Sequence, residues 1–162
     1  MFAIIKGDLL EAKEQYIAHA CNAVSNQAGG LAHYIFKKFP YANIYSSRPF
    51  PYRAIGKDFP GHIVIKGTGS QKRIINMLTQ YYPGTSNDEL SLKDGIKARI
   101  SYFTRCLIDI SKIDGLESVA FPKFVCCGLA GGDWLVYSDI LEKFSKKLKE
   151  KQNAKVVLYD NA

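Results

Sequence analysis

Short apolar runs alternate with amphipathic segments along the chain. Residues 2–6 and 15–21 are apolar and rich in Ile, Tyr and Cys, a composition typical of short buried strands. Residues 62–80 contain two such runs around a Gly-Thr-Gly-Ser turn, which predicts a hairpin or a close pair of strands. Two further strands are predicted within 118–126 and at 155–160.

Three segments carry the spacing of an amphipathic helix. The first runs over 31–39 and is stopped by Pro40. In the second, apolar residues recur every three or four positions over 92–110, and Ser91 and Asp94 resemble a capping box. The third has the same spacing over 136–148.

Strands that alternate with helices predict an α/β sheet with parallel central strands and helices on both faces. Ligands of such sheets bind beyond the carboxyl ends of the strands. Residues 40–61 are rich in Pro, Tyr and Ser and predict a long irregular excursion. The length of 162 residues suits one domain, spanning 1–162.

Composition is that of an ordinary soluble globular protein, with 47% apolar and 23% charged residues. No apolar run approaches the length of a membrane span, and the N-terminus lacks the features of a secretory signal. We therefore expect a cytoplasmic protein without a membrane partner. The cysteines, which have no CxxC spacing and no paired His, predict reduced, packed thiols and no metal site: Cys21, Cys106, Cys126 and Cys127.

The net charge of +7 is concentrated in one region. Residues 37–73 hold eight Lys and Arg against Asp58 alone, so this region accounts for the whole excess. A field of this kind attracts polyanions or phosphorylated small molecules. A solvated basic face that serves solubility is an equal alternative from charge alone.

Two glycine-rich loops each connect a predicted strand to a predicted helix. They are "NQAGGLA" at 26–32 and "CGLAGGDW" at 127–134. Glycines before a helix let backbone N–H groups approach an anion, and the helix dipole favours negative charge there. Two such loops at one sheet edge suit the two phosphates of a diphosphate. Neither loop has the dinucleotide or phosphate-loop fingerprint, which disfavours nicotinamide redox and nucleotide triphosphatase chemistry.

These motifs resemble the macrodomain family of ADP-ribose binders. The resemblance rests on "KGDLL", "AHACNAVSNQAGGLAHYIFKKFP", "FPKFVCCGLAGGDW" and a final "VVLY", which occur in the family's order and span essentially the whole chain. The most similar branch contains the ADP-ribose 1″-phosphate phosphatases and the terminal ADP-ribose protein glycohydrolase. The resemblance implies a three-layer α/β/α sandwich on a mixed sheet of about six strands, and no cofactor.

The resemblance also assigns ligand-binding roles. It implies that Asp8 accepts a hydrogen bond from the adenine amino group, that the Leu9 N–H bonds a ring nitrogen, and that Tyr159 stacks on adenine. Without it, Asp8 begins a turn and Tyr159 is a core or edge aromatic. Backbone groups of the two glycine loops are implied to hold the diphosphate, from Gly29, Gly30 and Leu31 on one side and from Cys127, Gly128, Leu129, Ala130 and Gly131 on the other.

Three residues are candidates for catalysis. Asn22 matches the family position that faces the distal ribose, or else it supplies a turn or a helix cap. His19 matches a histidine of the phosphatase branch, and a hydrogen-bonded core histidine is the equal alternative. Asp133 precedes a predicted helix, where an N-cap is favoured over activation of water.

The chain departs from the glycohydrolase pattern. That enzyme uses a Lys in the mid-chain strand region and an Asp in the second glycine loop, where this sequence has Gln80 or Tyr81 and Ala130. We therefore expect hydrolysis of an ADP-ribose derivative at the distal ribose, as in the phosphatases. The alternative is a non-catalytic binder that sequesters such nucleotides or binds ADP-ribosylated protein or nucleic acid. A third alternative is direct nucleic-acid binding through residues 37–73.

Overall fold

The computed structural model of the chain describes residues 1–49, 58–86 and 91–161. One six-stranded sheet has the order β1-β6-β5-β2-β4-β3. Neighbouring strands are parallel except for β3, which is antiparallel to β4. The strands are β1 (Ala3–Lys6), β2 (Tyr16–Asn22), β3 (His62–Lys66), β4 (Arg73–Gln80), β5 (Ser118–Pro122) and β6 (Lys155–Asp160).

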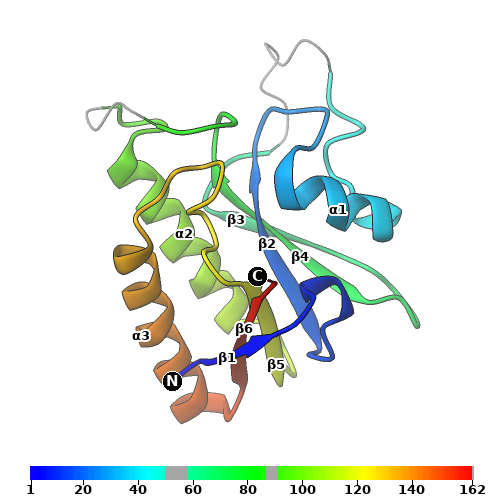
Figure 1. The fold of residues 1–162 in the computed structure, drawn as a ribbon, viewed down its shortest axis with the longest axis vertical. Coiled ribbons are helices and arrows are strands. Elements are labelled where there is room, and N and C mark those ends of the chain that lie inside the picture. Colours follow the sequence, from blue (N-terminus) through cyan, green and yellow to red (C-terminus); the bar gives the residue numbers. More distant parts are fainter. Residues whose placement is uncertain (50–57, 87–90, 162) are drawn as a thin grey trace.

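Helices cover both faces of this sheet. Helix α1 (Gly30–Lys38) packs on one face, and α2 (Ile96–Ser111) and α3 (Trp134–Gln152) lie side by side on the other (Figure 1). Two short 3₁₀ helices, η1 (Leu9–Glu11) and η2 (Pro40–Ala42), lie on the α1 side. The predicted three-layer α/β/α sandwich with a mixed six-stranded sheet is confirmed.

The two sheet faces build two separate cores because successive strand residues point to opposite faces. Ala18 of β2 packs with Phe103 of α2 and Leu141 of α3. Its neighbour Ile17 packs with Ile35 of α1 on the other side. All five side chains are apolar and fully buried, so the sheet is fixed between its helical layers.

The predicted strands and the hairpin are present, but the N-terminal strand is not buried as expected. All four residues of β1 are exposed, including Ile4 and Ile5. The strand pairs only with β6 and forms an edge of the sheet. Apolar composition predicted a strand correctly here but could not distinguish an edge strand from a central one.

The second helix begins later than the sequence predicts. Leu92 is 97% exposed and lies outside α2, which starts at Ile96. The Ser91 hydroxyl does accept a hydrogen bond from the Asp94 N–H, but Asp94 turns its carboxylate away from the helix toward residues 81 and 82. In the predicted irregular stretch 40–61, η2 is the one regular element among the described residues, and 50–57 lie outside them.

Candidate functional site

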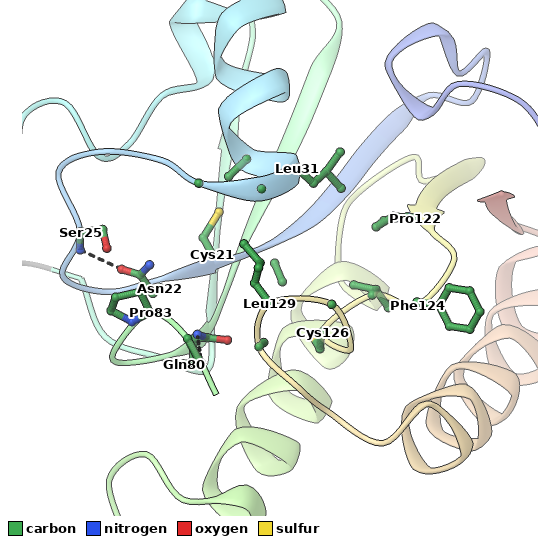
Figure 2. Close-up of a pocket in the computed structure, with 18 of the residues that line it drawn as sticks. Cys21, Asn22, Ser25, Leu31, Gln80, Pro83, Pro122, Phe124, Cys126 and Leu129 are labelled. Carbon is green, nitrogen blue, oxygen red and sulfur yellow. Dashed lines mark hydrogen bonds between the residues drawn. The ribbon is translucent and has the colours of Figure 1, made fainter. Parts of the chain in front are cut away.

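A cavity of about 420 Å³ opens at the carboxyl edge of the sheet. Three strand ends contribute to it: Asn22 of β2, Gln80 of β4 and Pro122 of β5. In Figure 2, Asn22 and Gln80 lie toward one end of the cavity, and Pro122 and Phe124 lie toward the other. This position is the one that α/β sheets favour for ligands, because loops converge beyond the ends of parallel strands.

The first glycine loop brings the N-terminus of α1 to the cavity. Gly29, Gly30, Leu31 and Ala32 line the wall. Gly29 is the N-cap and has no side chain to cap the helix, and the first turn holds no acidic residue. The first N–H groups of a helix have no partner within it and attract anions. This end of α1 is therefore suited to a negatively charged group.

The second glycine loop faces α1 across the cavity. Gly128, Leu129 and Ala130 line it, and their N–H groups make no hydrogen bond within the parts of the chain that the structure describes. The Leu129 side chain reaches the opposite loop, because a Cβ added to Gly30 would lie 2.8 Å from Leu129 Cδ1. Successive free N–H groups of this kind form concavities that bind anions.

Two of the predicted contributors from this loop are used differently. The N–H of Cys127 donates to the Phe124 carbonyl at 2.9 Å, and that of Gly131 donates to the Gly128 carbonyl at 3.0 Å. Neither residue lines the cavity. The hydrogen bonds inside the loop therefore leave residues 128–130, and not the full predicted span, to present N–H groups to a ligand.

The loop is held in a strained backbone conformation. Phe124 and Cys126 have φ values of 64° and 65°, which non-glycine residues adopt rarely. Strain of this type is concentrated at ligand-binding sites, where the surrounding structure maintains it. Here it turns Phe124 outward, and the ring is 49% exposed and packs edge-on against Trp134.

Asn22 shapes the opposite end of the cavity. Its Oδ1 accepts hydrogen bonds from the N–H groups of Val24 (3.0 Å) and Ser25 (2.8 Å). This interaction forms the predicted turn and orients the amide, so that Nδ2 is left as a donor at the cavity wall (Figure 2). The Asn22 N–H donates to the Tyr45 hydroxyl at 2.8 Å. The turn and a ligand contact are therefore compatible at this residue.

Charge in the cavity is sparse and positive. Among the described lining residues, Lys123 is the one with a charged side chain, and its ammonium bonds Asp160 and lies 4.9 Å from the Phe124 ring centre. Two thiols line the cavity as well. Burial raises the pKa of Cys21 to about 12 and raises that of Cys126 further, so both are protonated and poor nucleophiles.

His19 does not reach the cavity. Its ring is fully buried between β2 and α1, where Nε2 lies 2.6 Å from Asn76 Oδ1 and the ring packs edge-on against Phe36. Burial lowers the pKa of His19 to about 4, against the opposing effect of the Asn76 hydrogen bond. The geometry is that of the hydrogen-bonded core histidine, the alternative given above, and not of an acid or base that titrates near neutrality.

The predicted adenine-binding residues lie outside the cavity wall. Asp8 follows β1 at the same sheet edge as Pro122, is exposed, and accepts a hydrogen bond from the Leu10 N–H at 2.9 Å. Leu9 is buried in the core beside α1. Tyr159 is only 8% exposed, and its hydroxyl bonds the Glu14 carboxylate. As placed, Tyr159 is a core aromatic, whereas Phe124, which lines the cavity, is 49% exposed.

Asp133 takes the structural role given above as an alternative. Its carboxylate accepts a hydrogen bond from the Leu135 N–H at 3.0 Å and caps α3. It lines a separate cavity of about 290 Å³ between the N-terminal ends of α2 and α3. The structure thus brings Asn22 and the glycine loops together, while His19 and Asp133 lie behind the cavity walls.

Several basic residues in the described part of region 37–73 make local contacts. Lys38 pairs with Glu11, and Arg48 pairs with Asp58 at 2.8 Å. The Lys72 ammonium and the Arg73 guanidinium donate to backbone carbonyls. Arg53 and Lys57 lie outside the described residues. Of the described basic residues in this region, two therefore form ion pairs, and two others donate to backbone carbonyls and keep their charge.

Sequence reasoning missed a third loop, which follows β4. Pro83 and Gly84 line the cavity, and the Gln80 side chain donates to the carbonyls of Tyr82 (2.7 Å) and Gly84 (3.4 Å). The Pro-Gly dipeptide is a standard turn signal, and its position directly after an apolar strand places it at the sheet edge. That signal was sufficient to predict the loop.

Two further findings concern the described part of the chain. Within it, no three His, Cys, Asp or Glu side chains gather so that they could hold a metal ion. None of its helices is long and apolar enough to cross a membrane.

The comparisons with known proteins identify the fold. No protein-family model matches the sequence, and no curated protein matches it. Among solved structures, the macrodomain of Mycobacterium tuberculosis DarG is similar over 100% of this chain and 99% of its own, with 22% identity and a TM-score of 0.69. The Trypanosoma brucei macrodomain in complex with ADP-ribose is similar over 98% of this chain and 63% of its own, with 14% identity and a TM-score of 0.67. The chain therefore has the macrodomain fold.

Proposed function

We propose that this macrodomain fold binds ADP-ribose, or a close derivative of it, in the cavity at the carboxyl edge of the sheet. The observation that carries the proposal is the pair of facing loops, in which the N-terminus of α1 and the N–H groups of residues 128–130 converge on one space. Two sets of amide donors on opposite walls suit the two phosphates of a diphosphate. The similar trypanosomal macrodomain, solved with ADP-ribose, supports this choice of ligand.

The two ends of the cavity differ in chemistry, and this difference orients the ligand. At one end, the half-exposed Phe124 ring suits a nucleobase, and Asp8 lies beyond it at the same sheet edge. At the other end, the Asn22 amide suits the hydroxyls of a ribose, because Nδ2 donates hydrogen bonds. Adenine therefore lies toward Phe124 and the distal ribose toward Asn22.

We further propose hydrolysis at the distal ribose, with ADP-ribose 1″-phosphate as the preferred substrate. Water and the substrate give ADP-ribose and inorganic phosphate. Asn22 would position the water and the ribose, while the loops hold the diphosphate still. Catalysis here depends on positioning, because His19 is buried and neutral and Asp133 caps α3.

A non-catalytic binder is the second candidate, and a specific observation favours it. Apart from Lys123, no lining residue in the described ranges carries an ionisable group that is charged at neutral pH. General acids and bases commonly contribute 10²–10⁴-fold to turnover, and this cavity offers none of the usual carboxylates or accessible imidazoles. A non-catalytic binder needs only the backbone amide donors and the two ends of the cavity, near Phe124 and near Asn22.

Calorimetric titration with ADP-ribose tests the proposal, and product analysis on ADP-ribose 1″-phosphate separates the two candidates. Binding with phosphate release supports the hydrolase. Binding with phosphate release no faster than in buffer leaves the binder. If the titration shows no heat of binding with ADP-ribose at millimolar concentration, both candidates are wrong.

The Asn22→Asp variant sharpens this test. The carboxylate still accepts the N–H groups of Val24 and Ser25, so the turn is kept, but the donor at Nδ2 is lost. One lost hydrogen bond corresponds to about tenfold weaker ADP-ribose binding. If the chain is a hydrolase, turnover should fall by more than binding does.

Asn43→Asp is the matched control. Asn43 makes the same kind of turn, accepting the N–H groups of Tyr45 (2.9 Å) and Ser46 (3.2 Å), but it does not line the cavity. Affinity should be unchanged in this variant. Equal losses in both variants would show that the Asn22 effect is not a ligand contact.

A further inference from the structure

A buried ion pair lies directly behind the cavity wall. The Arg99 guanidinium bonds the Asp94 carboxylate through two contacts, Nη2 to Oδ2 at 2.7 Å and Nε to Oδ1 at 3.2 Å. The two residues are 6% and 9% exposed. Desolvation offsets much of the attraction in a buried ion pair, so the pair contributes little net stability, and its hydrogen bonds to neighbouring loops carry more information about its role.

The remaining donors of Arg99 hold two loops that form the cavity. Nη1 donates to the Gly84 carbonyl at 2.7 Å and to that of Ala130 at 3.4 Å, and Nη2 donates to the Tyr82 carbonyl at 3.2 Å. Gly84 lies on one side of the cavity and Ala130 on the second glycine loop. One guanidinium therefore links the loop after β4 to the loop after β5.

Neighbouring contacts strengthen the same link. The Asp94 carboxylate also accepts the N–H groups of Tyr81 (2.7 Å) and Tyr82 (3.3 Å). The Thr85 hydroxyl donates to the Leu129 carbonyl at 3.3 Å, which joins the two loops a second time. The turn at residues 82–84 is thus held from behind by the ion pair and from the front by Gln80.

This arrangement depends on the shape of the arginine side chain. A planar guanidinium has five donors in a fixed fork and can serve a carboxylate and several carbonyls at once, whereas an ammonium on a flexible stem cannot. The best-held atoms, the Tyr82 and Gly84 carbonyls, flank Pro83 at the Asn22 end of the cavity (Figure 2).

We propose that the Asp94–Arg99 pair is a positioning brace that fixes the wall around the distal ribose and thereby makes the site prefer ADP-ribose over ADP. This inference rests on the proposed function, because it assumes that the distal ribose lies between Asn22 and Pro83. Arg99 acts through the loop carbonyls and does not itself line the cavity. Loosening the brace should weaken ADP-ribose binding more than ADP binding, because the shorter contacts of Arg99, to the Gly84 (2.7 Å) and Tyr82 (3.2 Å) carbonyls, hold the distal-ribose end, whereas its contact to Ala130 in the diphosphate loop is the longest at 3.4 Å.

The test measures the affinities of ADP-ribose and ADP, by calorimetry, for the wild type and for Arg99→Lys. We expect at least tenfold weaker binding of ADP-ribose and less than threefold weaker binding of ADP, so that the selectivity ratio falls. A purely structural role for Arg99 would lower thermal stability and weaken both ligands equally, and that result overturns the inference. A wild type that does not bind ADP-ribose at all overturns the proposed function and this inference with it.

Two further variants keep the test decisive. Thr85→Val removes the exposed link to Leu129 with little change of shape, and it should lower the ratio about threefold even if Arg99→Lys does not fold. If Arg99→Lys does not fold, the result for Thr85→Val decides. An unchanged selectivity of a folded Thr85→Val for ADP-ribose over ADP then overturns the brace. Arg105→Lys is the matched control, because Arg105 lies on the same helix over the Tyr102 ring and away from the cavity, and its ratio should equal that of the wild type.

Discussion

The environment of a single side chain, His19, decides what it can do. Its ring is fully buried and bonds Asn76, and burial lowers the pKa of His19 to about 4. At neutral pH the imidazole is therefore uncharged, and it has no path to a ligand in the cavity. Its contribution belongs to folding, where it links β2 to β4 under α1.

This placement predicts how stability depends on pH. In the unfolded chain His19 takes up a proton near pH 6.5, whereas in the folded chain it does so only near pH 4. Because the unfolded state binds the proton first as the pH falls, stability is fully present above pH 6.5 and is lost between 6.5 and 4. The free energy of unfolding should fall by about 2 kcal/mol from pH 7 to pH 5 through this residue.

Urea unfolding of the wild type and His19→Gln at both pH values measures this loss, and the variant should show the smaller decrease. His33→Gln is the control, because His33 is exposed on α1 and packs only edge-on against Tyr34. A wild-type decrease that His19→Gln leaves intact would mean that His19 is not the group responsible.

Residue types indicated candidates, but burial determined which of them face the cavity. The Asn22 turn was predictable because asparagine commonly bonds the backbone two and three residues on. The fate of Tyr159 was not predictable, since an aromatic at the end of a strand suits a core and a stacking surface equally. Only the burial of Tyr159 in the core on the α1 side of the sheet and its bond to Glu14 separate the two.

At the scale of elements, the junction of β2 and α1 depends on Gly30. Its φ of +56° is costly for other residues, and an added Cβ would lie 2.8 Å from Leu129 Cδ1. We expect Gly30→Ala to lower the free energy of unfolding by about 1 kcal/mol through the backbone conformation. It should also weaken ADP-ribose binding about tenfold, because the Leu129 side chain must shift and the facing loop with it.

Gly69→Ala separates these two effects. Gly69 has a φ of +57° in the turn between β3 and β4, and an added Cβ would meet nothing within 4 Å. Both variants should lose similar stability in chemical unfolding, while only Gly30→Ala should lose affinity in calorimetry. Equal affinities of the two variants for ADP-ribose would show that the contact between the glycine loops does not contribute to binding.

Element boundaries followed from local sequence where the signal was local. Pro40 correctly predicted the end of α1, and the alternation of strands and helices correctly predicted parallel strands in the centre of the sheet. The start of α2 was misplaced because Leu92 fits the helical spacing, although the Asp94 carboxylate is bound to Arg99 and to the loop after β4. The contact between Asp94 and the loop after β4 joins two different segments. The spacing of apolar residues within one segment carries no information about such a contact.

At the scale of the molecule, five parallel strands point their carboxyl ends to one edge, and the chain places its loops with free backbone N–H groups there. The sequence predicted this edge and the two glycine loops. The third loop was missed although the Pro83-Gly84 turn signal was present in the sequence. The ion pairs Lys38–Glu11 and Arg48–Asp58 in the basic region 37–73 were not predictable, because they depend on contacts that form only on folding.

In the proposed function, backbone N–H groups of the two glycine loops bind the diphosphate of ADP-ribose. Titration of the ¹⁵N-labelled chain with ADP-ribose, followed by amide resonances, tests it most directly. The amides of the facing walls should shift most and saturate together, namely those of Leu31, Ala32, Gly128, Leu129 and Ala130. Amides at the far ends of α2 and α3, such as Lys112 and Lys147, should not move. Saturable shifts confined to other parts of the chain, or no shifts at millimolar ADP-ribose, would contradict diphosphate binding by these loops.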